Sequence, residues 1–150
     1  METWNKISKT LSNKTIAVIF VFIGLLGFLD AAYLAIGHYR GALPPCSIVH
    51  GCSQVLTSQY STFVGVPVAL LGAGYYLFIL VASLAYLESK SESMLRLAAK
   101  MTILGVLASI YFLALQIFVI RAYCLYCLGS AATATILFIV GRFVKKTAAP

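Results

Sequence analysis

Charge is what this chain has least of. Charged residues make up 10% of its 150 positions and only four are acidic, whereas hydrophobic residues make up 61%. A soluble domain of this length cannot bury so much apolar surface, so the composition excludes an ordinary soluble protein and indicates an integral membrane protein. Internal repeats and low-complexity segments are also absent. The length leaves room for one compact unit, residues 1–150, and not for two domains.

The few charges that exist are mostly basic, and their positions matter more than their sum of +7. A basic chain can bind nucleic acid, but here the Lys and Arg residues are not interleaved with a polar groove. The N-terminus, the connector 88–100 and the C-terminus hold three each, while Arg40 and Arg121 stand alone in the other two connectors. Basic flanks beside apolar runs are typical of membrane proteins. We therefore expect a lipid bilayer and no nucleic acid as partner.

Apolar runs predict an all-α integral membrane fold, a bundle of four transmembrane helices. Roughly twenty helical residues span the hydrocarbon core of a bilayer. The first run is too long for a signal peptide and lacks a clear cleavage site, so we expect a retained helix. Asp30 interrupts that run, and a carboxyl there is either close to an interface or functional. The expected helices cover residues 15–36, 66–87, 101–120 and 124–141.

The first connector is the longest and the most polar. Pro44-Pro45 excludes a helix through that point, and Gly51 favours a turn. Residues 53–60 favour a short helix on the membrane surface. An even number of spans places both termini on one side, and the basic flanks place that side in the cytosol. The loop and all four cysteines then lie on the extracytoplasmic side, which is commonly oxidising.

Two cysteines stand at the start of the last expected helix, in the sequence Cys124-Leu125-Tyr126-Cys127. Residues three apart share a helix face, and the first-turn amides and helix dipole favour a thiolate. These are the properties of a dithiol that forms and breaks a disulfide reversibly. The alternative is that both cysteines are small apolar fillers of a membrane helix.

The other two cysteines, Cys46 and Cys52, lie in the first connector with five residues between them. A disulfide here closes a small ring and restricts the unfolded chain little, which favours an exchangeable bond over a structural one. A static loop bridge remains the alternative. Four cysteines can also bind zinc, but this C-x5-C spacing differs from zinc knuckles, so we predict no metal. Two pairs on one membrane face predict electron transfer by thiol exchange.

The order of these motifs resembles the vitamin K epoxide reductase family. The resemblance lies in CSIVHGCSQVLTS, where Ser58 follows the second cysteine by six residues, and in YCLYC on the last helix. It covers nearly the whole chain and implies a membrane oxidoreductase. Prokaryotic members reoxidise a thioredoxin-like, disulfide-forming protein and pass the electrons to a quinone. Because the sequence stops at Pro150, we expect that partner to be a separate chain.

The resemblance also implies a role for each cysteine. Cys46 exchanges with the partner, Cys52 carries electrons to Cys124, and Cys127 reduces a quinone of the ubiquinone, menaquinone or vitamin K type. Ser58 corresponds to a loop serine close to the redox centre. With no retrieval signal at the C-terminus, the resemblance favours a prokaryotic cell membrane, and the endoplasmic reticulum is the alternative.

The quinone site is expected between the helices of the bundle. The Asn and Tyr that hold the naphthoquinone in the mammalian enzymes correspond to positions near Val68 and at Ala131, neither of which can form that hydrogen bond. This favours plain quinone reduction over epoxide reduction. Phe63, Phe112 and Tyr123 are the aromatic candidates for the same pocket.

Two other interpretations stay open. The chain could be a vitamin K epoxide or quinone reductase of the eukaryotic type, or a non-enzymatic membrane protein with static disulfides. The disulfide bond protein B family also combines four helices with two thiol pairs. There the C-x-x-C pair precedes the wider pair, the reverse of the order in this chain.

Overall fold

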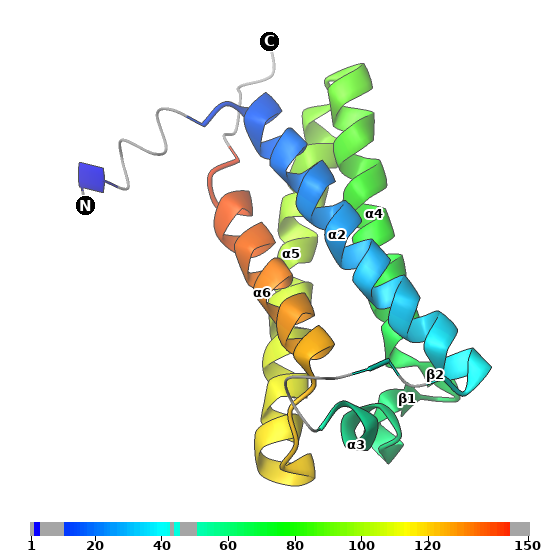
Figure 1. Cartoon of the computed structure of the whole chain (residues 1–150). Helices are drawn as coiled ribbons and strands as arrows, with labels where there is room; N and C mark the ends of the chain where they lie inside the picture. Colours follow the sequence, from blue (N-terminus) through cyan, green and yellow to red (C-terminus); the bar gives the residue numbers. More distant parts are fainter. Residues whose placement is uncertain (1, 4–10, 43, 46–50, 145–150) are drawn as a thin grey trace.

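A computed structural model describes residues 2–3, 11–42, 44–45 and 51–144. Long helices dominate it, and they run side by side along one axis (Figure 1). They are α2 (Asn13–Arg40), α4 (Val68–Ser89), α5 (Glu92–Ala114) and α6 (Leu125–Gly141). The α5 helix continues as a π-helical segment, η2 (Leu115–Ile120). Helix α2 packs along α4, and α5 packs along α6. The predicted helical class is confirmed.

Three of these helices are long and apolar enough to cross a membrane: α2, α4 and the continuous helix Glu92–Ile120. Helix α6 is apolar but shorter, at 17 residues. The outer surface of the bundle carries large exposed apolar side chains, including Phe22, Leu26, Leu104 and Phe118. Such a surface is stable in lipid and not in water. The chain is therefore an integral membrane protein.

The helix ends differ from the sequence-based prediction for identifiable reasons. Helix α2 runs four residues past position 36 because Gly41 adopts a left-handed conformation (φ 65°) that caps it at Arg40. Residues 92–100 were expected to be a connector but belong to α5. Leu95 and Ala98, three positions apart, are fully buried there, so packing of one face makes this charged segment helical.

The segment between α2 and α4 forms a small cap over one end of the bundle. It contains a short helix α3 (Cys52–Leu56), a 3-10 turn η1 (Gln59–Ser61), and an antiparallel pair of two-residue strands. The strands, β1 (Thr62–Phe63) and β2 (Val66–Pro67), were not expected, and they delay the start of α4 to Val68. The short surface helix predicted at 53–60 is present as α3 and η1.

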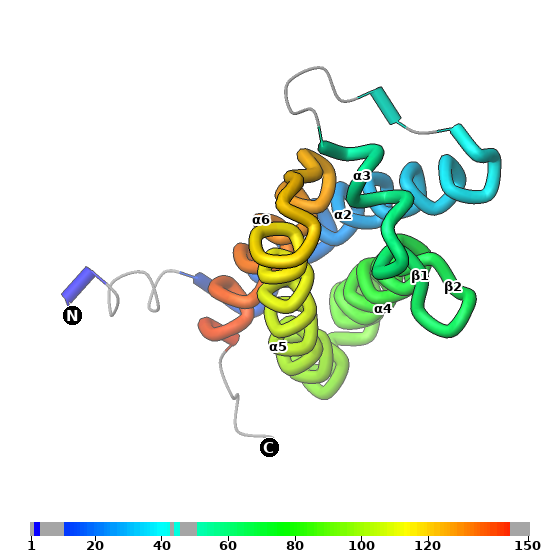
Figure 2. The backbone as a smooth tube through the Cα atoms, turned by 90° about the horizontal axis from the view of Figure 1, so that it is seen from below, coloured from blue at the N-terminus to red at the C-terminus, as the bar shows by residue number. Residues whose placement is uncertain are grey.

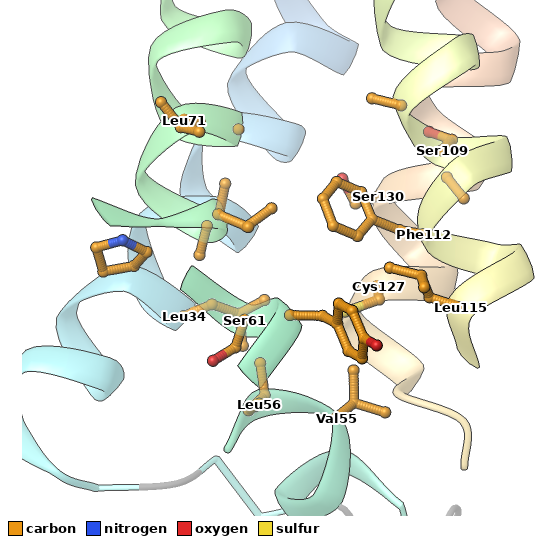
Figure 3. Close-up of a pocket in the computed structure, with 18 of the residues that line it drawn as sticks. Leu34, Val55, Leu56, Ser61, Leu71, Ser109, Phe112, Leu115, Cys127 and Ser130 are labelled. Carbon is orange, nitrogen blue, oxygen red and sulfur yellow. The ribbon is translucent and has the colours of Figure 1, made fainter. Parts of the chain in front are cut away.

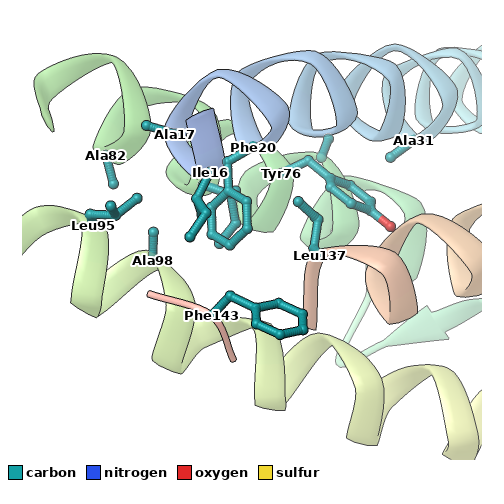
Figure 4. Packing of buried hydrophobic residues seen from close by; sticks show 12 residues of the cluster. Ile16, Ala17, Phe20, Ala31, Tyr76, Ala82, Leu95, Ala98, Leu137 and Phe143 are labelled. Atoms are coloured by element: carbon teal, nitrogen blue, oxygen red, sulfur yellow. The ribbon is translucent and has the colours of Figure 1, made fainter. Parts of the chain in front are cut away.

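The cap and the described chain ends lie at opposite ends of the bundle (Figure 1). In Figure 2, which looks at the bundle from below, α3 of the cap lies across this end between α6 and α4. The hydrophobic core extends from the end near Asn13 and Phe143 to the middle (Figure 4). Ile16, Phe20 and Leu137 have no exposed surface there. Tyr76 packs directly over Gly27, where any β-carbon would overlap its ring. At the cap end the helices diverge, and the space between them is the candidate site.

Candidate functional site

Three of the four cysteines are described, and they meet beneath the cap. Cys52 at the start of α3 and Cys124 just before α6 are buried in one hydrophobic cluster with Val55 and Ala122. We call this the cysteine cluster. Cys127 packs against it from the first turn of α6. Cys46 lies outside the described residues. The structure thus joins parts of the chain that are 72 positions apart, from Cys52 to Cys124.

The described cysteines are in two oxidation states. Cys52 is disulfide-bonded, whereas Cys124 and Cys127 are free thiols. A buried thiol beside a disulfide is the arrangement in which thiol–disulfide exchange proceeds, since the attacking sulfur must reach a sulfur of the bond. Among the described residues, no cluster of three or more His, Cys, Asp or Glu side chains could hold a metal ion.

A glycine brings the loop close to the C-x-x-C motif. A β-carbon added to Gly51 would lie 2.6 Å from the carbonyl oxygen of Tyr123 and 2.8 Å from its nitrogen. Real β-carbons do not approach other atoms so closely, and these atoms belong to backbone that cannot rotate away. Only glycine at position 51 therefore permits the loop to pack directly on the residues that precede Cys124.

Gln116 holds Cys124 in place, and sequence reasoning missed it. Its side chain is 2% exposed, and its Oε1 accepts a hydrogen bond of 3.0 Å from the backbone N–H of Cys124. The π-helical turn η2 carries Gln116, and Arg121 ends that turn in a left-handed conformation (φ 54°). A π-helix is rare and often marks a functional position. The available signal was a polar residue within an apolar run.

The Cys124 thiol is more acidic than an ordinary cysteine. It lies just before α6 begins. A hydrogen bond from the Cys127 thiol lowers the pKa of Cys124 to about 7, although burial acts in the opposite direction. The backbone N–H groups of Cys127 and Tyr126, at the start of the helix, contribute to the same lowering. A substantial fraction of Cys124 is therefore thiolate at neutral pH, the form that attacks disulfides.

A large cavity opens between the helices on the inner side of Cys127 (Figure 3). Its volume is about 550 Å³, a usual size for a small-molecule site. Figure 3 shows Phe112 and Leu115 of α5 and η2 near Cys127, with Val55 and Leu56 of the cap below them. The lining is mostly apolar, and no Lys or Arg of the described chain contributes to it.

Most of the site residues predicted from the sequence line this cavity. Val68 opens α4, Phe112 belongs to α5 and Ala131 to α6, and all three contribute, as do Phe63 and Ser58 of the cap. The Ser58 hydroxyl donates a 2.8 Å hydrogen bond to the carbonyl of Val55, which fixes the end of α3. Tyr123 is absent from the lining; its side chain is about half exposed, and its backbone lies beside Gly51 of the loop.

Two polar atoms of the cavity have no hydrogen-bond partner in the described part of the chain. They are Oδ2 of Asp30 and the hydroxyl of Tyr75, and both are buried. A polar group inside a membrane protein normally has a partner, because lipid offers none. The cavity therefore fits a flat apolar ligand with a small number of oxygen atoms, which is the character of a quinone.

The chain matches the model of the Vitamin K epoxide reductase family over residues 18–141. No individual curated protein is significantly similar to it. The family match covers most of the chain, includes Cys52, Cys124 and Cys127, and confirms the family inferred from the cysteine spacing. The chain belongs to the vitamin K epoxide reductase family. Members of this family are membrane oxidoreductases, and membership supports a membrane redox function for this protein.

Proposed function

We propose that this protein is a membrane thiol:quinone oxidoreductase that supports disulfide bond formation. Its electron donor is a separate thioredoxin-like protein, and its acceptor is a membrane quinone. One observation carries the proposal: disulfide-bonded Cys52 and the free thiol Cys124 share a buried cluster, while Cys127 lines an apolar cavity on the other side. Protein thiols and a lipid-soluble acceptor can both reach the same pair of sulfurs.

In the proposed relay, the partner first reduces the Cys46–Cys52 pair by exchange. Cys52 then attacks the oxidised Cys124–Cys127 pair, so that one disulfide breaks and one forms at each step and no net oxidant is consumed. The last exchange leaves Cys124 and Cys127 as thiols, the state seen in the structure. A bound quinone supplies an acceptor for the two electrons and two protons that these thiols give up.

The residues that would hold the quinone are Phe63, Val68, Phe112 and Ala131, which line the cavity. Phe112 offers a flat surface for a ring. Val68 and Ala131 offer no side-chain hydrogen bond, and this supports quinone reduction over the epoxide reduction of the eukaryotic type. The size of the quinone ring and tail that fit between the helices determines which quinone the protein uses.

We also propose that α6 is a fourth span and that both termini face the cytosol of a prokaryotic cell. Seventeen helical residues extend about 26 Å, slightly less than the hydrocarbon core. Most basic residues of the described chain lie near the end of the bundle where α2 begins and α6 ends, and the cap, with Arg40 and Arg121 near it, occupies the other end. The former are Lys14, Lys90, Arg96, Lys100 and Arg142. This orientation places the cysteine cluster on the extracytoplasmic side, where a disulfide-forming partner is found.

Alkylation in intact membranes tests whether the thiols cycle. Dithiothreitol should make Cys124 and Cys127 available to a maleimide reagent, and a subsequent addition of quinone should protect both as they form a disulfide. A protein with static disulfides would show the same alkylation pattern under every condition. That result would contradict the proposal and favour the non-enzymatic alternative.

A further inference from the structure

Asp30 lies inside the long apolar helix α2, away from both of its ends. It stands ten residues before the last residue of the helix, Arg40, which corresponds to about 15 Å along the axis. An aspartate side chain spans only a small part of that distance. An acidic residue within an apolar membrane helix is costly to keep there, so it is a candidate for function.

The neighbours of Asp30 do not satisfy it. Its Oδ2 is buried without a hydrogen-bond partner among the described residues. The nearby Tyr76 hydroxyl is already engaged with the Ser130 carbonyl at 2.8 Å, the Ser130 hydroxyl at 2.9 Å and the Thr133 hydroxyl at 2.8 Å. Asp30 thus keeps one unpartnered oxygen, and it belongs to the lining of the cavity.

The same cavity contains the thiol that must lose a proton. Cys127 lines it, and the Asp30 carboxylate acts electrostatically on Cys127 and Cys124. Cys127 is the redox-active thiol among the described residues that line the cavity, and Asp30 is the only carboxyl among them. The ionisable side chains that share the cavity with Asp30 are His38 of α2, Tyr60 of η1, Tyr75 and Tyr76 of α4, Tyr111 of α5 and Cys127 of α6.

We propose that Asp30 carries the proton of the Cys127 thiol to the quinone oxygen during turnover, a role that rests on the function proposed above. Oxidation of the Cys124–Cys127 dithiol breaks two S–H bonds, forms one S–S bond and releases two electrons and two protons. All four are consumed when the quinone becomes a quinol. Asp30 accepts the proton from Cys127 and donates it to a quinone oxygen, so it ends each cycle as it began. The Cys124 proton accounts for the second O–H bond.

The test compares two ways of oxidising the dithiol in the purified full-length chain. One oxidant is a short-chain benzoquinone, which must receive protons within the cavity. The other is a small aromatic disulfide, which reacts by thiol exchange and needs no cavity. Asp30→Asn should slow oxidation by the benzoquinone about 100-fold or more, the typical loss for one proton-transfer group. Its reaction with the aromatic disulfide should stay within about twofold of the wild type.

Glu92→Gln is the matched control. Glu92 is another carboxylate with a buried, unpartnered oxygen, but it lies at the start of α5 outside the cavity lining. The control should behave as wild type with both oxidants. Should Asp30→Asn fail to fold, Asp30→Glu replaces it: the pH profile of benzoquinone reduction should move while that of disulfide exchange stays fixed.

If wild type and Asp30→Asn reduced benzoquinone at equal rates, the role of Asp30 would be overturned and the proposed function would stand. An unmoved pH profile of the Asp30→Glu variant would have the same meaning. An equal loss with both oxidants would also overturn that role, because it would indicate a general disturbance of the thiols. A wild-type protein that exchanges with the aromatic disulfide but never reduces benzoquinone would refute the proposed function itself.

Discussion

At the scale of single residues, the acidity of Cys124 is the property that most directly controls reactivity. Its thiol lies at the helix start, and the Cys127 thiol stabilises the negative charge by a hydrogen bond. The Asp30 carboxylate acts against this by repulsion. The pKa of Cys124 therefore depends on both Cys127 and Asp30.

This coupling predicts how alkylation of Cys124 depends on pH. With a pKa of about 7, the thiolate fraction is about one tenth at pH 6 and about nine tenths at pH 8, and the rate should follow it. Cys127→Ala removes the hydrogen-bond donor, so the midpoint should move upward, toward the value of an ordinary cysteine. Mass spectrometry of iodoacetamide-treated protein between pH 5 and 10 measures this. A midpoint unchanged by Cys127→Ala would contradict the assignment.

Gln116 shows where residue-level prediction ends. A polar side chain within the run from 101 to 120 is visible in the sequence, but nothing in its spacing indicates that it reaches the backbone of Cys124. That contact depends on the π-helical turn η2 and on the return of the chain at Arg121. By contrast, the cysteines and Ser58 were recognisable because they form a motif at fixed spacing.

At the scale of elements, the cap must pack closely on the chain that leads into α6. Gly51 makes this possible, because a side chain there would collide with the backbone of Tyr123. Gly51→Ala should displace α3 and separate Cys52 from Cys124. We expect electron transfer from the loop pair to the C-x-x-C pair to slow by about tenfold or more, which corresponds to an activation barrier raised by about 1.4 kcal/mol or more.

The appropriate control is Gly74→Ala in α4, where an added β-carbon meets nothing within 4 Å. The measurement is the rate at which reduced loop cysteines convert an oxidised Cys124–Cys127 pair to thiols, followed by rapid acid quenching and alkylation. Quinone reduction by chemically reduced protein should be unaffected in both variants. If Gly51→Ala transferred electrons as fast as Gly74→Ala, close packing of the cap would not matter for the relay.

The elements themselves were largely predictable, and their ends were not. Apolar runs identified the four long helices because membrane helices must be continuously apolar. The end of α2 depends on one left-handed glycine, Gly41, and the start of α5 depends on burial of Leu95 and Ala98 against other helices. Local hydropathy contains neither kind of information. The sequence predicted that a pocket lies between the helices but not its full lining, because the lining residues come from four helices and the cap.

At the scale of the whole molecule, the hydrophobic core and the candidate site lie at different ends of the bundle. The core around Phe20 and Leu137 lies toward the chain termini, whereas the cysteine cluster and the cavity lie under the cap. Cys124 packs in the cysteine cluster with Cys52 of the cap, and Cys127 packs against that cluster and also lines the cavity. We propose that electrons pass through this pair from the loop to a ligand in the cavity.

Quinol formation driven by a protein thiol tests that claim most directly. The purified full-length chain is mixed with a reduced thioredoxin-like protein and a panel of benzoquinones and naphthoquinones, and quinol is followed by absorbance. We predict turnover by the wild type and by Glu92→Gln, and its abolition by Cys46→Ala and by Cys127→Ala. Full turnover in both cysteine variants would contradict the relay.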